Sequence, residues 1–303
     1  MVQEMFAPFV FGISLQRSNN RFREKDMKKI LLLIAAMGIL TGVISCSNDD
    51  EPIRTVFTVN TPMVNHMVNM SNGEVLGVAS THNKLTIDTV KHTASLELNY
   101  NTGDGDKQLV INDIIATPNG LFYSLTSPGY SQFSGYVDFS EGGAMRYRYV
   151  TENGIRIISI TPEVFFRKTE SIITYDDTTE TNKTENTMYQ FNITPSSQIA
   201  TVKVMDIVHA KDLKSFIDIT ANGVPYTVTA NGFTIAAENL KTIAHYMAYV
   251  DSTGSNVATT YKYPFKTFNA TIDLANDHLD ADYMIGGSAT VHATGKTYPD
   301  YTY

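Results

Sequence analysis

Four side chains near residue 65 carry donor atoms that a soft metal ion prefers: Met63, His66, Met67 and Met70. Thioether and imidazole groups are typical ligands of Cu(I) and of haem iron. In a helix all four side chains would share a face, whereas in a strand Met63 and Met67 would face away from His66 and Met70. The β-branched residues around them favour a strand. We therefore expect apolar packing by these methionines, with no metal and no cofactor.

Catalytic motifs are absent from the sequence. It contains no Gly-x-Ser-x-Gly elbow, no His-Glu-x-x-His zinc helix, no phosphate-binding Walker loop and no dinucleotide fingerprint. A glycosidase needs only two carboxylates that the fold brings together, but no pair of acidic residues stands out by its spacing. We expect no enzymatic activity and assign no catalytic residue.

Tyrosine is the aromatic residue that could form a ligand platform, because the chain has 17 Tyr and no Trp. Tyr123, Tyr130, Tyr136, Tyr147 and Tyr149 are concentrated in one stretch, where their rings could stack on sugar faces. Tyrosines in strands are more often half-buried, with only the hydroxyl in water. The structural interpretation is the stronger one, and the ligand-binding residues stay unknown.

The thiol of Cys46 is the one cysteine side chain of the sequence, and it follows an apolar segment. Lys28 and Lys29 precede the 15 apolar or small residues Ile30 to Ile44. A basic start, an apolar middle and a small residue before the cleavage point are typical of a secretory signal. The segment is shorter than the 18 or more apolar residues expected of a membrane-spanning helix. We therefore predict a signal peptide over residues 27–45.

The residues Val43-Ile44-Ser45-Cys46 resemble the lipobox of bacterial lipoproteins. The resemblance implies that the Cys46 thiol is diacylated, that the preceding peptide is removed and that the new amino terminus is acylated. Each buried acyl CH₂ contributes about 0.8 kcal/mol, so several chains would hold the protein at a membrane. Cys46 is thus the predicted lipidation site.

The segment after Cys46 is polar and acidic, and residues 46–55 are expected to form a tether. Its run Ser47-Asn48-Asp49-Asp50-Glu51 resembles the signal that sends Bacteroidota lipoproteins to the outer face of the outer membrane. An ordinary solvated linker is the alternative. Residues 1–26 do not fit a signal that starts naturally at Met27, and we expect them to be an upstream start assigned in error and to be unstructured.

Charge excludes one class of partner. The chain has a net charge of −8, and without residues 1–45 it has 17 basic and 28 acidic residues and a net charge of −11. Nucleic-acid binding needs clustered Lys and Arg, so this balance argues against it. It also argues against adsorption to anionic lipid, which leaves the acyl chains on Cys46 as the membrane attachment.

The remaining sequence has the pattern of an all-β protein. Apolar and polar residues alternate over several short runs, as in antiparallel sheets with one face on a core. The clearest runs are 93–98, 145–149, 155–160, 200–204 and 271–274, and Asn-Gly or Asp-Gly pairs separate many such runs. These turns favour hairpins and predict a sandwich or a barrel. Residues 236–247 are the best helical candidate, with a strand end and a loop as the alternative.

An internal repeat is indicated by two alignments. Residues 85–87 and 93–98 match residues 191–193 and 199–204 at an offset of 106. Residues 121–126 and 129–130 match residues 224–229 and 232–233 at an offset of 103. We therefore predict two tandem, duplicated, sandwich-like antiparallel β-domains over residues 56–174 and 188–303. The apolar-free stretch within residues 175–187 predicts an acidic linker or a long hairpin loop between them.

As a whole the sequence resembles the two-repeat β-rich lipoproteins of Bacteroidota, on its signal and repeat spacing. The resemblance implies a lipid-anchored outer-membrane protein that is exposed at the cell surface, or alternatively one that faces the periplasm. A non-catalytic module for binding or adhesion, with a glycan or protein ligand, is the leading function. The alternatives are a structural or accessory subunit of an outer-membrane assembly and, more remotely, a glycan-active enzyme.

Overall fold

The computed structural model describes ten stretches of the chain. They are residues 56–101, 105–130, 132–139, 144–175, 181–184, 187–207, 217–247, 258–261, 264–286 and 289–296. The predicted signal peptide, Cys46 and the tether lie outside the described residues. Within them, strands dominate and no helix is long and apolar enough to cross a membrane.

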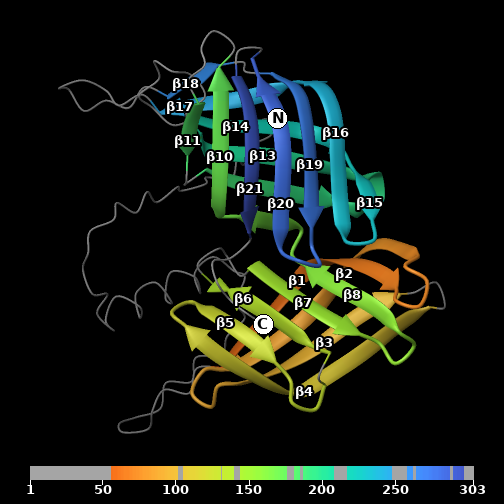
Figure 1. Ribbon diagram of the computed structural model, residues 1–303. Helices are drawn as coiled ribbons and strands as arrows, with labels where there is room; N and C mark the ends of the chain where they lie inside the picture. Colours follow the sequence, from red (N-terminus) through yellow and green to blue (C-terminus); the bar gives the residue numbers. More distant parts are fainter. Residues whose placement is uncertain are drawn as a thin grey trace, which may run out of the picture. The chain divides into compact units, whose positions relative to one another are not determined.

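The first eight strands close into an antiparallel barrel (Figure 1). Each strand pairs with the next along the chain, and β8 returns to pair with β1, where Val64 lies opposite Ile160. The strands are β1 Val56–Asn69, β2 Val75–Asp88, β3 Thr93–Asn101, β4 Asp106–Asn119, β5 Phe122–Thr126, β6 Ser134–Asp138, β7 Ala144–Val150 and β8 Ile155–Ile160. Closure pairs β1 on both sides over Val64–Val68, the part of the strand that faces both β2 and β8.

Alternation along each strand fills the barrel with side chains. On β1, Met63 and Met67 point inward, and on β7 the rings of Tyr147 and Tyr149 are fully buried. Eight strands enclose an interior just wide enough for side chains. The barrel of this protein therefore has a packed apolar core.

The second half consists of two sheets, which we call the two-sheet half. The seven-stranded sheet has the order β11-β10-β21-β20-β19-β16-β15, and the six-stranded sheet has the order β18-β17-β14-β13-β12-β9. The strands are β9 Glu163–Phe166, β10 Lys168–Tyr175, β11 Thr181–Thr184, β12 Met188–Thr194, β13 Ile199–Ile207, β14 Ile217–Pro225, β15 Thr227–Thr229, β16 Gly232–Leu240, β17 Thr242–Met247, β18 Ala258–Tyr261, β19 Phe265–Asp273, β20 His278–Ile285 and β21 Ala289–Lys296. A 3₁₀ turn, η2 Pro195–Ser197, joins β12 to β13.

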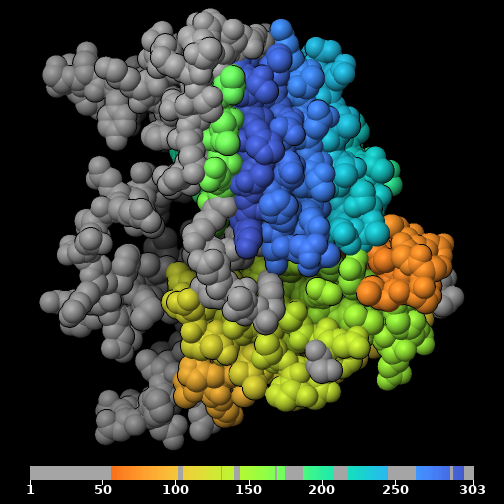
Figure 2. Space-filling view, in the orientation of Figure 1, coloured from red at the N-terminus to blue at the C-terminus, as the bar shows by residue number. Residues whose placement is uncertain are grey.

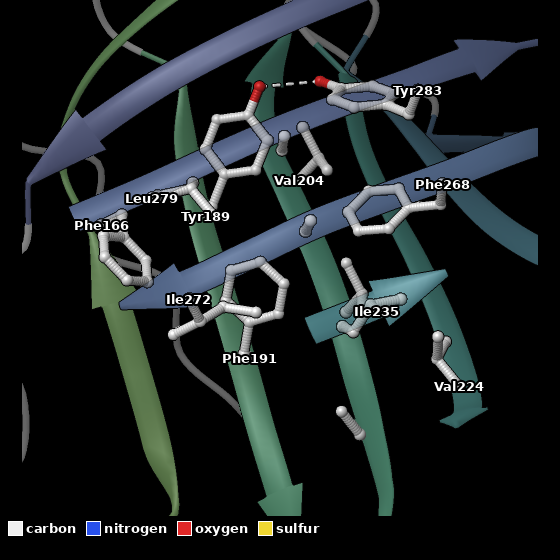
Figure 3. Close-up of a cluster of buried hydrophobic side chains, with 14 of the residues drawn as sticks. Phe166, Tyr189, Phe191, Val204, Val224, Ile235, Phe268, Ile272, Leu279 and Tyr283 are labelled. Atoms are coloured by element: carbon white, nitrogen blue, oxygen red, sulfur yellow. Dashed lines mark hydrogen bonds between the residues drawn. The ribbon is translucent and has the colours of Figure 1, made fainter. Parts of the chain in front are cut away.

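Aromatic residues from both sheets fill the core between them (Figure 3). Phe191 of the six-stranded sheet and Phe268 of the seven-stranded sheet are both fully buried. The Tyr189 and Tyr283 hydroxyls are 2.8 Å apart, and Ser171 Oγ lies 2.9 Å from the Tyr189 hydroxyl. Burial raises the pKa of Tyr189 to about 12. The three buried hydroxyls satisfy one another by hydrogen bonding.

The outer face of β1 and β8 belongs to this second core. Val64, Ile158 and Ile160 point away from the barrel interior and join the cluster of the two-sheet half. His66 Nε2 donates a hydrogen bond to the Thr229 carbonyl oxygen at 2.7 Å, and its imidazole meets the Phe233 ring edge-on. This face of the barrel is thus covered by apolar packing.

The all-β prediction is confirmed, and the tandem sandwich-like domains are not. Residues that were expected to form a first sandwich close into a barrel instead, because β8 pairs with β1. Strands β9 and β10 pair with β12 and β21 of the two-sheet half. The sheets therefore change between Ile160 and Glu163, and not at residues 175–187, within which β11 forms a hairpin with β10.

The predicted repeat holds for one hairpin. Leu85 lies opposite Leu96 in the β2–β3 pair, and Phe191 lies opposite Val202 in the β12–β13 pair, at the expected offset of 106. The second alignment does not hold, because residues 122–126 form a barrel strand whereas residues 224–229 run from the end of β14 into β15 of the other sheet. Similar alternation thus serves two different topologies.

Local predictions were mostly right for strands and wrong for the helix. Four of the five alternating runs lie within β3, β7, β8 and β13, and the fifth, 271–274, covers the end of β19 and one residue beyond it. Residues 236–247 form the end of β16 and the whole of β17, which lie in different sheets. Gly223, with a φ of +67°, lies within β14 beside a shift in its pairing with β13, so Ala221-Asn222-Gly223 is a bulge and not a hairpin turn.

Candidate functional site

Three arginines lie on the outer face of the barrel, and sequence reasoning did not single them out. Tyr147 and Tyr149 point into the barrel, so the alternating neighbours Arg146 and Arg148 on β7 point outward. Arg156 of β8 lies on the same side. The signal was present in the alternation of residues 145–149, which we used only to predict a strand.

Two of these arginines are held by the two-sheet half. Arg146 donates to the Leu274 carbonyl oxygen and forms an ion pair with Asp277, in the turn between β19 and β20. Arg156 Nη2 donates to the Ala230 carbonyl oxygen at 2.5 Å. Burial lowers the pKa of Arg156, and the positive charge of Arg148 lowers it further. Both side chains are thus committed to backbone or ionic partners.

Arg148 is the exposed member of the three. Among the described residues it has no hydrogen-bond or ion-pair partner. Arg148 lines a cleft of about 550 Å³, which we call the rim cleft. The rim cleft is lined by Thr126, Ser127, Gln132, Phe133, Ser134, Gly135, Arg146, Arg148, Val150, Ala275 and Asp277.

The wall of the rim cleft is rich in hydrogen-bond donors. Thr126 and Ser134 supply hydroxyls, and Gln132 supplies an amide. The Arg148 guanidinium presents a planar fork that matches the oxygens of a carboxylate, sulfate or phosphate. Phe133 and Val150 add apolar surface. A cleft of this size, with both apolar surface and several polar groups on its wall, suits a small molecule or a segment of a polymer.

Asp113 fixes the segment between β5 and β6 that forms one side of the cleft. Its carboxylate accepts hydrogen bonds from Ser127 Oγ and from the Gly129 backbone N–H, both at 2.7 Å. The hydrogen bond from Ser127 is the main reason that the pKa of Asp113 is lowered, because it stabilises the charged form. The Tyr130 hydroxyl donates to the Val150 carbonyl oxygen and ties the same segment to β7. The cleft wall is therefore held in place before any ligand binds.

Space is also restricted beneath the cleft. A Cβ on Gly135 would lie 2.5 Å from the Arg146 carbonyl oxygen. A side chain at this position would push β6 away from β7. Glycine therefore lets the two strands that carry Ser134 and Arg148 lie close together.

The five tyrosines singled out in the sequence do not form one platform. Tyr147 and Tyr149 are fully buried in the barrel, where burial raises the pKa of each hydroxyl. Tyr123 and Tyr130 pack against the same core, whereas Tyr136 faces outward and stacks on Phe122. The structural interpretation of these residues is therefore the one that the fold supports.

The candidate soft-metal cluster is divided between two faces of β1. Met63 and Met67 lie in the barrel core, and His66 lies on the opposite face against Thr229. Met70 is 50% exposed at the end of the strand. The prediction that this segment forms a strand is confirmed. The donor atoms of the four side chains therefore do not surround one point.

No family model matches this chain. No curated protein matches it either. Among solved structures, "a putative outer membrane protein" from Bacteroides fragilis NCTC 9343 is similar, with a TM-score of 0.31 and 12% sequence identity. The match covers 79% of this chain and 96% of that one.

Proposed function

We propose that this protein is a lipid-anchored lipoprotein of the cell envelope that binds an anionic ligand in the rim cleft. The observation that carries the proposal is exposed Arg148, which has no hydrogen-bond or ion-pair partner among the described residues and lines a cleft with hydroxyl and amide donors. The anchor is argued from the sequence alone. The two parts can be tested separately.

The anchor would be Cys46. Its position after a basic start and a 15-residue apolar segment is that of a lipidated cysteine. Two or more acyl chains give stable membrane attachment, which one chain does not. The acidic tether that follows would keep the folded part at a distance from the bilayer surface.

The ligand class follows from charge. The mature chain would have a net charge of −11, so its overall field repels anions. A cleft lined by Arg148, which has no partner within the described stretches, is then a local exception, and an acidic sugar, an acidic peptide or another carboxylate, sulfate or phosphate group would neutralise its charge. The outward hydroxyls would bind the neutral oxygens of such a ligand.

The anchor is tested by fractionating cells that carry an epitope after Tyr303, with Cys46→Ala as the variant. We expect the wild-type protein in the outer-membrane fraction and loss of the variant from membranes. Cleavage of the wild-type protein by proteinase K on intact cells supports surface display, whereas protection until the outer membrane is broken favours the periplasmic face. A membrane-bound Cys46→Ala variant would contradict lipid anchoring.

Ligand binding is tested by screening the purified protein against paired acidic and neutral polysaccharides and peptides. We expect retention of acidic members, weakened by salt because exposed charges are screened, and no change in polymer length. Retention of neutral members alone would contradict the anionic ligand. Shortening of a polymer would replace a binding function with an enzymatic one.

A further inference from the structure

The outer face of the seven-stranded sheet brings together three groups that the sequence keeps apart. Asp280 and Asp282 lie two residues apart on β20, so their side chains share a face, and His292 lies opposite Asp282 on β21. The imidazole and the two carboxylates each offer one donor atom, and these atoms lie within 4.8 Å of one another. From this geometry we propose that Asp280, Asp282 and His292 bind a divalent transition-metal ion.

The donor spacing fits a single ion with little movement. Nitrogen and oxygen ligands lie about 2.0–2.2 Å from a zinc ion, so two of them are at most about 4.4 Å apart. His292 Nδ1 and Asp282 Oδ1 are 2.8 Å apart. Closing the remaining gap needs rotation of exposed side chains, with the strands left in place.

The backbone that carries the three donors is held by the core. Ala281 and Tyr283 alternate with the two aspartates and are 1% exposed, and Val291 and Ala293 flank His292 with no exposure. β20 and β21 are central strands of their sheet, so each pairs on both sides. The site is thus built on rigid elements, which reduces the entropy lost on binding.

The proposed metal site carries two negatively charged carboxylates close together. Asp280 has no ion pair or hydrogen bond within the described part of the chain, and Asp282 has the imidazole of His292 as its hydrogen-bond partner. The carboxylates of Asp280 and Asp282 lie on the same face of β20 and repel each other. A divalent cation would relieve this repulsion, which water does only in part.

The site is open to solvent. The side chains of His292 and Asp282 are 49% and 61% exposed. Figure 2 shows β20 and β21, in blue, at the surface of the seven-stranded sheet. Water would fill the remaining coordination positions.

The donor set selects the class of ion. One imidazole with two carboxylates suits Zn²⁺, Co²⁺, Ni²⁺ or Cu²⁺, whereas Ca²⁺ takes six to eight oxygen ligands. A metal ion binds imidazole and carboxylate ligands in their deprotonated forms, so protons compete with it and its affinity falls as the pH is lowered. An ordinary solvated histidine–aspartate pair would lack this affinity.

The test is a calorimetric titration with ZnCl₂ of the full-length, tag-free, chelator-treated protein in detergent, with CaCl₂ as the comparison. We expect one Zn²⁺ per chain, weak or no heat with Ca²⁺, and a visible absorption band with Co²⁺. Loss of a ligand should cost at least as much as loss of an outer-shell partner, about tenfold or more in affinity.

The variants Asp280→Asn and His292→Gln test the assignment, with His82→Gln on the barrel as the matched control. His82 is exposed on β2, outside the proposed site. We expect both site variants to lose Zn²⁺ binding while the control binds as the wild type does and circular dichroism is unchanged in all three. Absence of Zn²⁺ binding to the wild type, or equal binding by both site variants, would overturn the proposal.

Discussion

Arg146 on β7 of the barrel and Asp277 in the β19–β20 turn form an ion pair in which the side chains are only 8% and 15% exposed. The pair joins the barrel to the two-sheet half and forms part of the wall of the rim cleft. Arg146 also donates to the Leu274 carbonyl oxygen in the same turn. One arginine therefore positions the side of the cleft that the second half of the chain provides.

Removing one member of this pair should destabilise the protein. Asp277→Asn keeps a residue that tolerates the φ of +57° at this position but leaves the Arg146 charge buried without its partner. We expect a loss of about 3 kcal/mol in the free energy of unfolding, measured by urea denaturation. The control is Lys84→Met, which breaks an ion pair between side chains 47% and 39% exposed and should cost less than about 1 kcal/mol. Equal losses would refute the role of Asp277.

The pH dependence of stability should reveal the lowered pKa of His66. Burial lowers the pKa of His66 most, the hydrogen bond to Thr229 raises it, and the charge of Arg156 lowers it. The folded protein then binds fewer protons than the unfolded chain, so stability falls as the pH drops below about 6.5 and stops falling below the folded pKa. We expect a slope of up to about 1.4 kcal/mol per pH unit in this window.

Comparison with His66→Gln isolates that contribution. Unfolding by urea between pH 8 and pH 5 should show a shallower slope for the variant than for the wild type. Parallel curves would mean that His66 titrates alike in the folded and unfolded states.

The hydrogen-bonded hydroxyls of Ser171, Tyr189 and Tyr283 in the core of the two-sheet half should contribute more to the free energy of unfolding than a single hydrogen bond does. Tyr189→Phe leaves Ser171 and Tyr283 buried without their shared partner. We expect a destabilisation of about 2 kcal/mol by urea denaturation. Tyr226→Phe is the control, because the Tyr226 hydroxyl is buried and makes no hydrogen bond within the described residues. Its removal should be neutral or slightly stabilising, and the reverse order of effects would contradict the hydrogen-bonded chain.

Substitutions of the methionines near residue 65 should differ in their effect on stability, according to whether the side chain is buried in the barrel or exposed. Met63→Ala removes a fully buried side chain from the barrel and should cost about 3 kcal/mol, whereas Met70→Ala at an exposed site should change stability by less than about 0.5 kcal/mol. Thermal and urea unfolding of the two variants would measure this difference. A large effect at Met70 would mean that its side chain is packed.

Sequence patterns predicted the strands well and the topology poorly. The alternation at residues 145–149 depends only on local burial, so it located β7 correctly. Barrel closure depends on the pairing of Val64 with Ile160, almost a hundred residues apart, which no local pattern records. The predicted repeat led to two equivalent domains for the same reason. The β2–β3 and β12–β13 hairpins share a register but belong to different sheets.

The candidate sites were missed because they depend on such distant pairings. The local sequence around Arg148 predicts only an outward-facing strand residue. The folded chain places Ala275 and Asp277 in the same cleft wall. His292 shows no ligand spacing along the chain, yet the β20–β21 register places it opposite Asp282. Cys46 was recognisable because a signal peptide is read from the linear sequence.

The most direct test of the proposed function is the salt-dependent affinity of the purified protein for its best acidic ligand, compared between wild type and Arg148→Gln. Lys91→Gln is the matched control, because it removes the same charge from an exposed position on the barrel. We predict at least about tenfold weaker binding and a smaller salt dependence for Arg148→Gln, with Lys91→Gln close to wild type. Equal affinities for all three proteins would show that the rim cleft does not bind the ligand through Arg148.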